Sequence, residues 1–330
     1  MRDVISQESK PEHVGNQLDR LDTQDIAARL AIILAGRYLV LRLIGIGGMA
    51  SVYLVRHRIH QGLFAVKVLH PAHAENPELL ARFRREGLLC ARLAGHPNIA
   101  PVLDVGEADG LHYLVMPYIR GEDLDHLLCR VGPFSFNDAI LATIQINDAL
   151  LYAWSKGVLH CDLTPGNIRL NEFGLFILVD FGLGSAGLSH HPPILPATST
   201  LRAGTPLYMS PEHILGDSID IRSDLYALGA ILYELLTGEA AFHGETIEEI
   251  QRKHLEPAPT LSHPVLLKHP GVESLLRSLL ARSPEERLAD PEVLQQALRN
   301  LTTSFPRLYV RPEMEPDPEI VAPRRRLSFS

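Results

Sequence analysis

The chain has 330 residues, of which 46% are hydrophobic and 21% charged, so it can bury one large core or two lobes. Its formal net charge of -8 argues against a general nucleic-acid binder, because phosphate contacts require a clustered positive face. The one dense basic run, Arg324 to Arg326, lies near the end of the sequence.

Cysteine usage and hydropathy bear on the compartment. Cys90, Cys129 and Cys161 are far apart and lack the C-x-x-C spacing of a zinc site, which favours a reduced, cytoplasmic location. The apolar stretch at residues 26–35 contains Arg29 and is about half the ~20 residues that a membrane span requires. Polar and acidic residues fill the segment before it, so we expect neither a membrane span nor a signal peptide.

Residues 1–36 are predicted to be an N-terminal extension. The polar, charge-mixed first part is expected to be disordered. After it, Ile26, Leu30 and Leu34 repeat at helical spacing and Asp25 is placed to cap a helix. We therefore expect a short helix that packs on the domain, with a docking or regulatory arm as the alternative.

Residues 38–55 contain two apolar, strand-like runs around the glycine-rich segment Gly45 to Ala50. Glycines let backbone N–H groups approach phosphate oxygens, because no Cβ stands in the way. A dinucleotide-binding fold would require a helix after the glycines. The residues that follow, SVYLV, are β-branched and aromatic, so the pattern favours a glycine-rich hairpin.

A strand predicted at residues 63–69 places Lys67 alone among apolar residues. A lysine there is unfavourable unless it meets an anionic partner, so Lys67 is a candidate phosphate ligand. The alternative is an edge-strand lysine that reaches water. In the helix predicted at residues 77–93, Glu86 is the candidate ion-pair partner of Lys67.

The loop at residues 158–170, VLHCDLTPGNIRL, carries Asp162 and Asn167 between two apolar runs. In phosphoryl transfer a carboxylate orients the acceptor hydroxyl and takes its proton, and Asp162 can supply that group. Asn167 can offer its amide oxygen to a metal ion bound to phosphates. Alone, this spacing is only moderately specific.

Taken in order, the motifs G-x-G-G-M-A-S-V-Y, A-V-K, R-F-R-R-E, H-C-D-L-T-P-G-N and D-F-G resemble the eukaryotic-like (Hanks-type) Ser/Thr protein kinases of bacteria. The resemblance covers roughly residues 37–300. It implies an α+β, bilobal protein kinase fold at residues 37–301, with a small β-rich N-lobe (37–116), a larger helical C-lobe (121–301) and ATP between them. Residues 302–330 are expected to be a flexible, Pro-rich tail.

The resemblance also implies the site residues. Asp162 would be the catalytic carboxylate, with Thr205 hydrogen-bonded near it, and Asn167 and Asp180 would bind Mg²⁺. Pro117 lacks an N–H group, but only its carbonyl would be needed for adenine, and Ile119 can still donate. The implied ATP contacts are Ile44, Gly45, Gly47, Gly48, Val52, Ala65, Lys67, Glu86, Met116, Pro117, Ile119 and Asp123.

Several positions in the second half are expected to be structural. The helix at residues 135–156 is read as core, and Gly238 as the C-terminal cap of the helix at residues 223–238. Asp224 in that helix is expected to accept hydrogen bonds from the catalytic loop. Glu212, in Ser-Pro-Glu, is expected to form a salt bridge with Arg287.

The catalytic loop departs from the family at two positions. Cys161 replaces an Arg that binds a phosphorylated activation-loop residue, so we expect activity that needs no phosphate at residues 198–200, Thr198, Ser199 and Thr200. Thr164 replaces a Lys that steadies the γ-phosphate, which leaves slow catalysis or a pseudokinase possible. Arg169 stands where an aliphatic residue often lies beneath adenine, and its methylene stem could substitute.

The sequence therefore predicts an ATP-dependent Ser/Thr protein kinase that transfers the γ-phosphoryl group of Mg-ATP to protein hydroxyls. The alternative is a nucleotide-binding pseudokinase that acts as a signalling scaffold. A small-molecule kinase is less favoured, because Ser-Pro-Glu and the long helical lobe resemble a protein-substrate platform. The expected partners are proteins bearing Ser or Thr, and no oligomeric state is indicated.

Overall fold

In the computed structural model of the protein, the described residues are 12–181, 185–186, 206–256, 261 and 263–302. The chain divides into two compact units. Unit 1 comprises residues 1–84 and 102–118, and unit 2 comprises residues 85–101 and 119–330. Unit 1 is rich in strands and unit 2 in helices, which confirms the predicted α+β class.

Unit 1 is built on one antiparallel sheet with the strand order β1-β2-β3-β5-β4. The β1 and β2 strands pair around the glycine-rich turn, with Gly45 opposite Val52, so the predicted hairpin is confirmed. The element directly after the glycines is strand β2 and not a helix, so the dinucleotide-binding alternative is wrong. The strands are β1 (Tyr38–Ile46), β2 (Ala50–His57), β3 (Leu63–Leu69), β4 (Asp104–Ala108) and β5 (Leu111–Pro117).

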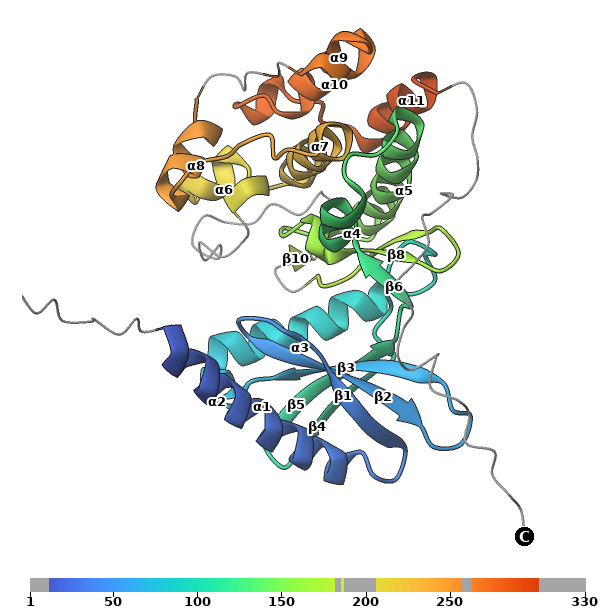
Figure 1. Ribbon diagram of the computed structural model, residues 1–330, viewed down its shortest axis with the longest axis vertical. Helices are drawn as coiled ribbons and strands as arrows, with labels where there is room; N and C mark the ends of the chain where they lie inside the picture. Colours follow the sequence, from blue (N-terminus) through green and yellow to red (C-terminus); the bar gives the residue numbers. More distant parts are fainter. Residues whose placement is uncertain (1–11, 182–184, 187–205, 257–260, 262, 303–330) are drawn as a thin grey trace, which may run out of the picture. The chain divides into compact units, whose positions relative to one another are not determined.

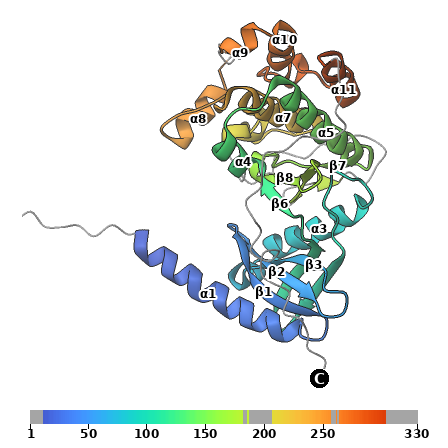
Figure 2. The ribbon, with the colours of Figure 1, turned by 45° about the vertical axis from the view of Figure 1, so that its right-hand side comes forward.

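Helix α1 (Glu12–Ile33) lies along this sheet (Figures 1 and 2). Its residues Ile26 and Leu30, together with Leu34 just after it, form one hydrophobic core with buried side chains of the sheet. The Tyr53 hydroxyl also donates to the carbonyl of Thr23 at 2.8 Å. The predicted packing is thus confirmed.

The same helix begins at Glu12, well before the predicted start at Asp25. Once packing against the sheet has formed a first turn, each further residue adds a hydrogen bond, so the helix extends into the polar segment. The predicted disorder of the polar segment is therefore wrong for residues 12–24, where the backbone is helical, and residues 1–11 lie outside the described residues. Two helices follow the third strand, α2 (Pro71–Ala74) and α3 (Pro77–Arg92).

Unit 2 is organised around α5 and α7, which lie side by side (Figure 1). Helix α11 packs on α5, and α10 packs on α7. Nearly all of α7 is buried, in keeping with its apolar sequence. The helices are α4 (Leu124–Val131), α5 (Phe136–Ser155), α6 (Pro211–Leu215), α7 (Ile221–Thr237), α8 (Ile247–His254), α9 (Pro264–Leu267), α10 (Pro270–Leu279) and α11 (Pro291–Asn300).

Side chains cap the start of two of these helices, and a glycine ends a third. Ser135 caps α5 by accepting a hydrogen bond from the N–H of Asp138, and Thr246 caps α8 in the same way through Glu249. Gly238 ends α7 at φ +77°, a conformation that favours glycine. The predicted cap at Gly238 is confirmed, whereas the predicted cap at Asp25 is wrong, because Asp25 lies inside α1.

Short strands and 3₁₀ turns position the loops of unit 2. Strand β8 pairs with β6 on one side and with β9 on the other, and β7 pairs with β10. The β8–β9 pair forms an antiparallel hairpin at residues 168–178. The elements are β6 (Gly121–Asp123), β7 (Val158–Leu159), β8 (Ile168–Asn171), β9 (Phe176–Leu178), β10 (Ser185–Ala186), η1 (Pro165–Asn167), η2 (Pro206–Tyr208) and η3 (Pro284–Glu286).

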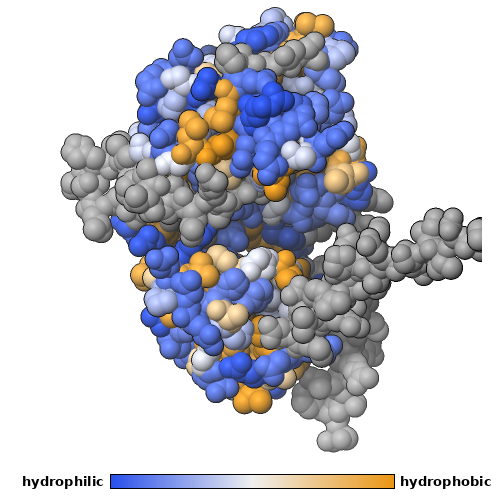
Figure 3. Space-filling model, turned by 90° about the vertical axis from the view of Figure 1, so that its left-hand side faces the viewer, coloured by the Kyte–Doolittle hydropathy of each residue, from blue (hydrophilic) through white to orange (hydrophobic). Residues whose placement is uncertain are grey.

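The surface shown in Figure 3 is mostly hydrophilic, and its hydrophobic residues form small, separate groups. Among the described helices, none has an apolar stretch long enough to cross a lipid bilayer.

Candidate active site

The loop that carries Asp162 is fastened to α7 by one buried carboxylate. Asp224, 3% exposed, accepts hydrogen bonds from the backbone N–H groups of His160 at 2.9 Å and Cys161 at 2.8 Å. Burial raises the pKa of Asp224 to about 6, although both hydrogen bonds act in the opposite direction. The predicted role of Asp224 is confirmed.

These hydrogen bonds hold a backbone conformation that is unfavourable for cysteine. Cys161 has φ +65°, in the left-handed region that residues with a Cβ rarely occupy. The turn directs the chain from the buried His160 to the half-buried Asp162. The backbone geometry at Cys161 therefore determines where the Asp162 carboxylate points.

Asn167 and Asp162 are brought together, as their spacing suggested. The Asn167 side-chain amide donates from Nδ2 to the backbone carbonyl of Asp162 at 2.8 Å. This bond fixes the amide plane and occupies the nitrogen. Oδ1 of Asn167 is then the atom that remains suited to a cation.

Asp180 lies at the same end of the β8–β9 hairpin as Asn167. The strands pair Ile168 with Leu178, and the N–H of Val179 donates to the backbone carbonyl of Asn167 at 2.9 Å. Asp180 follows directly, exposed and with φ +64°. A carboxylate and an amide oxygen from adjacent chain segments are the donor types that Mg²⁺ prefers.

His160 has a position that the sequence interpretation did not assign. Its ring is fully buried and lies 4.6 Å from the ring of Phe181, centroid to centroid. Burial lowers the pKa of His160 to about 4, although the nearby charge of Asp180 acts in the opposite direction. A neutral, buried ring is a packing group between the Asp162 loop and the Asp180 segment. The apolar residues around His160 in the sequence VLHCDL are the feature from which its burial could have been predicted.

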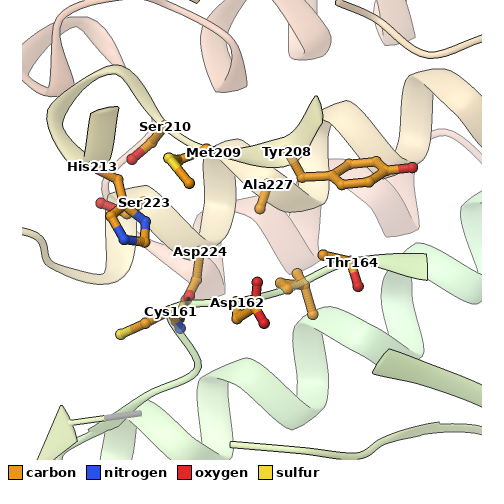
Figure 4. A pocket seen from close by; sticks show the side chains of 11 residues that line it. Cys161, Asp162, Thr164, Tyr208, Met209, Ser210, His213, Ser223, Asp224 and Ala227 are labelled. Carbon is orange, nitrogen blue, oxygen red and sulfur yellow. Dashed lines mark hydrogen bonds between the residues drawn. The ribbon is translucent and has the colours of Figure 1, made fainter. Parts of the chain in front are cut away.

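A small pocket lies in front of Asp162 (Figure 4). Figure 4 shows the Asp162 carboxylate in the space between its own loop and the segment that carries Tyr208 and Met209. Ala227 and Asp224 of α7 complete the wall. The segment before α6 therefore lies beside the candidate catalytic carboxylate.

Helix α6, which directly follows this segment, is anchored by the predicted salt bridge. Arg287 donates to both carboxylate oxygens of Glu212, at 2.6 and 2.7 Å, and its side chain is fully buried. Burial alone would raise the pKa of Glu212, but the Arg287 guanidinium more than offsets this and lowers it. The Ser223 hydroxyl donates to the same carboxylate, and the Arg287 guanidinium lies 4.7 Å from the ring centre of Tyr226.

Lys67 is half-buried on β3, which is the central strand of the unit 1 sheet. Its Cα is opposite Val52 on one side and Leu114 on the other. The alternative of an edge-strand lysine is therefore wrong. Among the predicted adenine contacts, Ala65 lies opposite Met116 in the same sheet.

Other predicted contacts remain predictions. Glu86 is buried on the part of α3 that belongs to unit 2, whereas Lys67 belongs to unit 1, and their ion pair stays a prediction. Asp123 caps α4 by accepting a hydrogen bond from the N–H of His126 at 2.8 Å. The Arg169 guanidinium donates to the carbonyl of Gly121. Thr205 and the three hydroxyls at positions 198–200 lie outside the described residues.

Comparison with known proteins gives a consistent result. Residues 38–298 match the model of the protein kinase domain family. The chain is 35% identical over 269 residues to the serine/threonine-protein kinase PrkC of Bacillus subtilis, covering 81% of this chain and 40% of the relative. It is also 35% identical over 285 residues to the serine/threonine-protein kinase pkn3 of Myxococcus xanthus, with coverages of 84% and 52%.

A third relative is the serine/threonine-protein kinase PknB of Mycobacterium tuberculosis, 35% identical over 263 residues, with coverages of 77% and 41%. In all three cases this chain spans about half the length of the relative or less.

Proposed function

The chain belongs to the protein kinase domain family, and we propose that it transfers the γ-phosphoryl group of Mg-ATP to serine and threonine hydroxyls of proteins. The observation that carries the proposal is the grouping of Asp162, Asn167 and Asp180 on one loop and one hairpin. A base, a metal-binding amide and a metal-binding carboxylate are what this reaction requires.

Asp162 supplies the base. Its carboxylate orients the acceptor hydroxyl and takes its proton while the oxygen bonds to the γ-phosphorus and the bond to the β-phosphate oxygen breaks. The half-buried position of Asp162 supports this role, because its side chain lines the small pocket of Figure 4.

Asn167 and Asp180 would hold Mg²⁺. One carboxylate and one amide oxygen fit this cation, which in proteins is usually completed by phosphate oxygens and water. An ion held by these two residues would neutralise charge on the transferring phosphates.

The remaining contacts belong to the nucleotide. Lys67, oriented by Glu86, would bind the α- and β-phosphates, and Asp123 would contact the ribose. The carbonyl of Pro117 and the N–H of Ile119 would hold adenine, and Thr205 would support Asp162. The glycine-rich turn and the apolar wall complete the set through Ile44, Gly45, Gly47, Gly48, Val52, Ala65 and Met116.

A transfer assay with radiolabelled ATP tests the proposal directly. The purified chain should label itself or a generic acceptor protein. Asp162→Asn and Lys67→Met should each lower the rate by about 10² or more. Equal transfer by the wild type and Asp162→Asn would contradict the proposed base.

We further propose that activity does not depend on phosphorylation at residues 198–200. Cys161 stands where the family places an Arg, and a thiol cannot form the charge-assisted hydrogen bonds that hold a phosphate. The Cys161 side chain is 9% exposed and lies against the pocket wall.

A nucleotide-binding scaffold is the second candidate. The buried, neutral Thr164 favours it, because this position has no cation for the γ-phosphate. A scaffold would show a melting temperature that shifts with Mg-ATP but no transfer of label, whereas a kinase would show both.

For the protein as a whole, we propose that residues 37–301 are the kinase domain, flanked by residues 1–36 and 302–330. Its partners would be bacterial cytoplasmic proteins that present Ser or Thr, in a signalling role.

A further inference from the structure

The turn of the β1–β2 hairpin has few restraints of its own. Ile46, Gly47 and Gly48 are exposed, and a Cβ built at Gly48 would meet no atom within 4 Å. The β1–β2 ladder is also irregular between Leu43 and Gly45. The conformation of the turn therefore depends on how its β2 end is anchored.

The β2 end of the turn is anchored to His70, the residue directly after β3. The N–H of His70 donates to the carbonyl of Met49 at 2.9 Å, which extends the β2–β3 ladder by one step. Inside the turn, the N–H of Gly47 donates to the carbonyl of Ala50 at 2.9 Å. The backbone of the turn is thus linked to His70 through Met49 and Ala50.

A side-chain hydrogen bond reinforces this link. The Ser51 side chain is fully buried on β2, and its Oγ lies 2.9 Å from Nε2 of His70. A buried hydroxyl requires a partner, because leaving it without one loses the hydrogen bonds it made to water. Ser51 is adjacent to the turn, and His70 is three residues beyond Lys67.

We propose that Ser51 and His70 are positioning residues that hold the glycine-rich turn, relative to Lys67, in the arrangement that binds the phosphates of the nucleotide. The inference rests on the proposed function, since it assigns a task to the turn that the function requires. All of its contacts lie within unit 1, so it does not depend on the placement of unit 2.

The test uses the full chain and compares nucleotides with and without phosphates. Ser51→Ala and His70→Leu should each raise KM for ATP about fivefold, the loss expected for one hydrogen bond, with kcat and the KM for the acceptor protein unchanged. Adenosine has no phosphates, so its Kd, measured by calorimetric titration, should not change.

Two further variants separate positioning from general destabilisation. His70→Gln keeps a hydrogen-bonding side chain and should restore most of the ATP affinity. His73→Leu is the matched control, because His73 lies close by, with its ring 5.9 Å from that of His70, and should bind ATP like the wild type. The double variant Ser51→Ala/His70→Leu should be no weaker than the worse single variant, because both remove the same bond.

The outcomes are distinct. ATP affinities of Ser51→Ala and His70→Leu equal to the wild type would overturn the inference, as would a parallel loss of adenosine affinity. A wild-type chain that neither binds Mg-ATP nor transfers label would instead contradict the proposed function.

Discussion

Asp224 illustrates how one side chain can determine the geometry of a reactive loop. Its two oxygens accept the N–H groups of successive residues, and the second of these, Cys161, has the left-handed φ of +65°. The strained turn is retained because both donors would otherwise be buried without partners. The direction of Asp162 thus depends on a residue 62 positions further along the chain.

Replacing the Asp224 carboxylate should lower the stability of the fold. Asp224→Asn keeps one acceptor oxygen and places an NH₂ group against a backbone donor. We expect the free energy of unfolding to fall by about 2 kcal/mol, measured by urea denaturation. Asp290→Asn is the control, because Asp290 only caps α11 and asparagine caps a helix equally well. Similar losses in both variants would argue against the assigned role.

The Cys161 position leads to a second prediction at this scale. The triple variant Thr198→Ala/Ser199→Ala/Thr200→Ala should keep most of the wild-type kcat, because no arginine precedes Asp162 to bind a phosphate. Radiolabel transfer to a generic acceptor protein measures it, with Asp162→Asn as the inactive reference. A collapse of turnover in the triple variant would refute the proposed independence.

Among the helices, the contact between α7 and α10 depends on a glycine. A Cβ added to Gly229 would lie 2.8 Å from Cβ of Leu279, an atom that cannot move without the α10 backbone. The absence of a side chain at Gly229 therefore determines how closely these two helices pack.

We expect Gly229→Ala to lower the free energy of unfolding by about 1–3 kcal/mol, in spite of a helix propensity that favours alanine by about 1 kcal/mol. Thermal or urea denaturation measures the change. Adding Leu279→Ala should recover none of the loss, because alanine keeps the Cβ atom that the new methyl group would meet. A stabilised Gly229→Ala variant would show that propensity outweighs packing here.

At the scale of the whole molecule, buried histidines make stability depend on pH. Burial lowers the pKa of both His160 and His254 to about 4, from 6.5 in the unfolded chain. Between these values the unfolded state binds more protons, so their contribution to stability is lost as pH falls from about 6.5 toward 4. Asp224 acts in the opposite direction, since its pKa is raised to about 6.

The lowered pKa values of His96 and His213 act in the same direction as those of His160 and His254, whereas the raised pKa of Glu234 acts with that of Asp224. The histidines outnumber the carboxylates, so we expect a net loss of stability on acidification below pH 6.5. The melting temperature should therefore fall between pH 7 and pH 5. His254→Gln removes one of the titrating groups and should flatten this dependence, which makes it the comparison variant. A melting temperature that rises on acidification would contradict the assignment of neutral, buried rings.

The sequence by itself was sufficient to predict the features that depend on neighbouring residues. The glycine-rich hairpin, the caps at Ser135 and Gly238 and the spacing of Asp162 from Asn167 follow from nearby residues, because turns, caps and short loops use neighbours in the chain. The resemblance to a family added the longer-range pairs, including Glu212 with Arg287.

Only the tertiary structure decided the rest. The start of α1, the central position of Lys67 in the sheet, the burial of His160 and the hydrogen bond between Ser51 and His70 all depend on which strands pair and what packs against them. Burial and strand register are properties of the whole fold. Residues distant in sequence determine them, so a local sequence pattern cannot predict them.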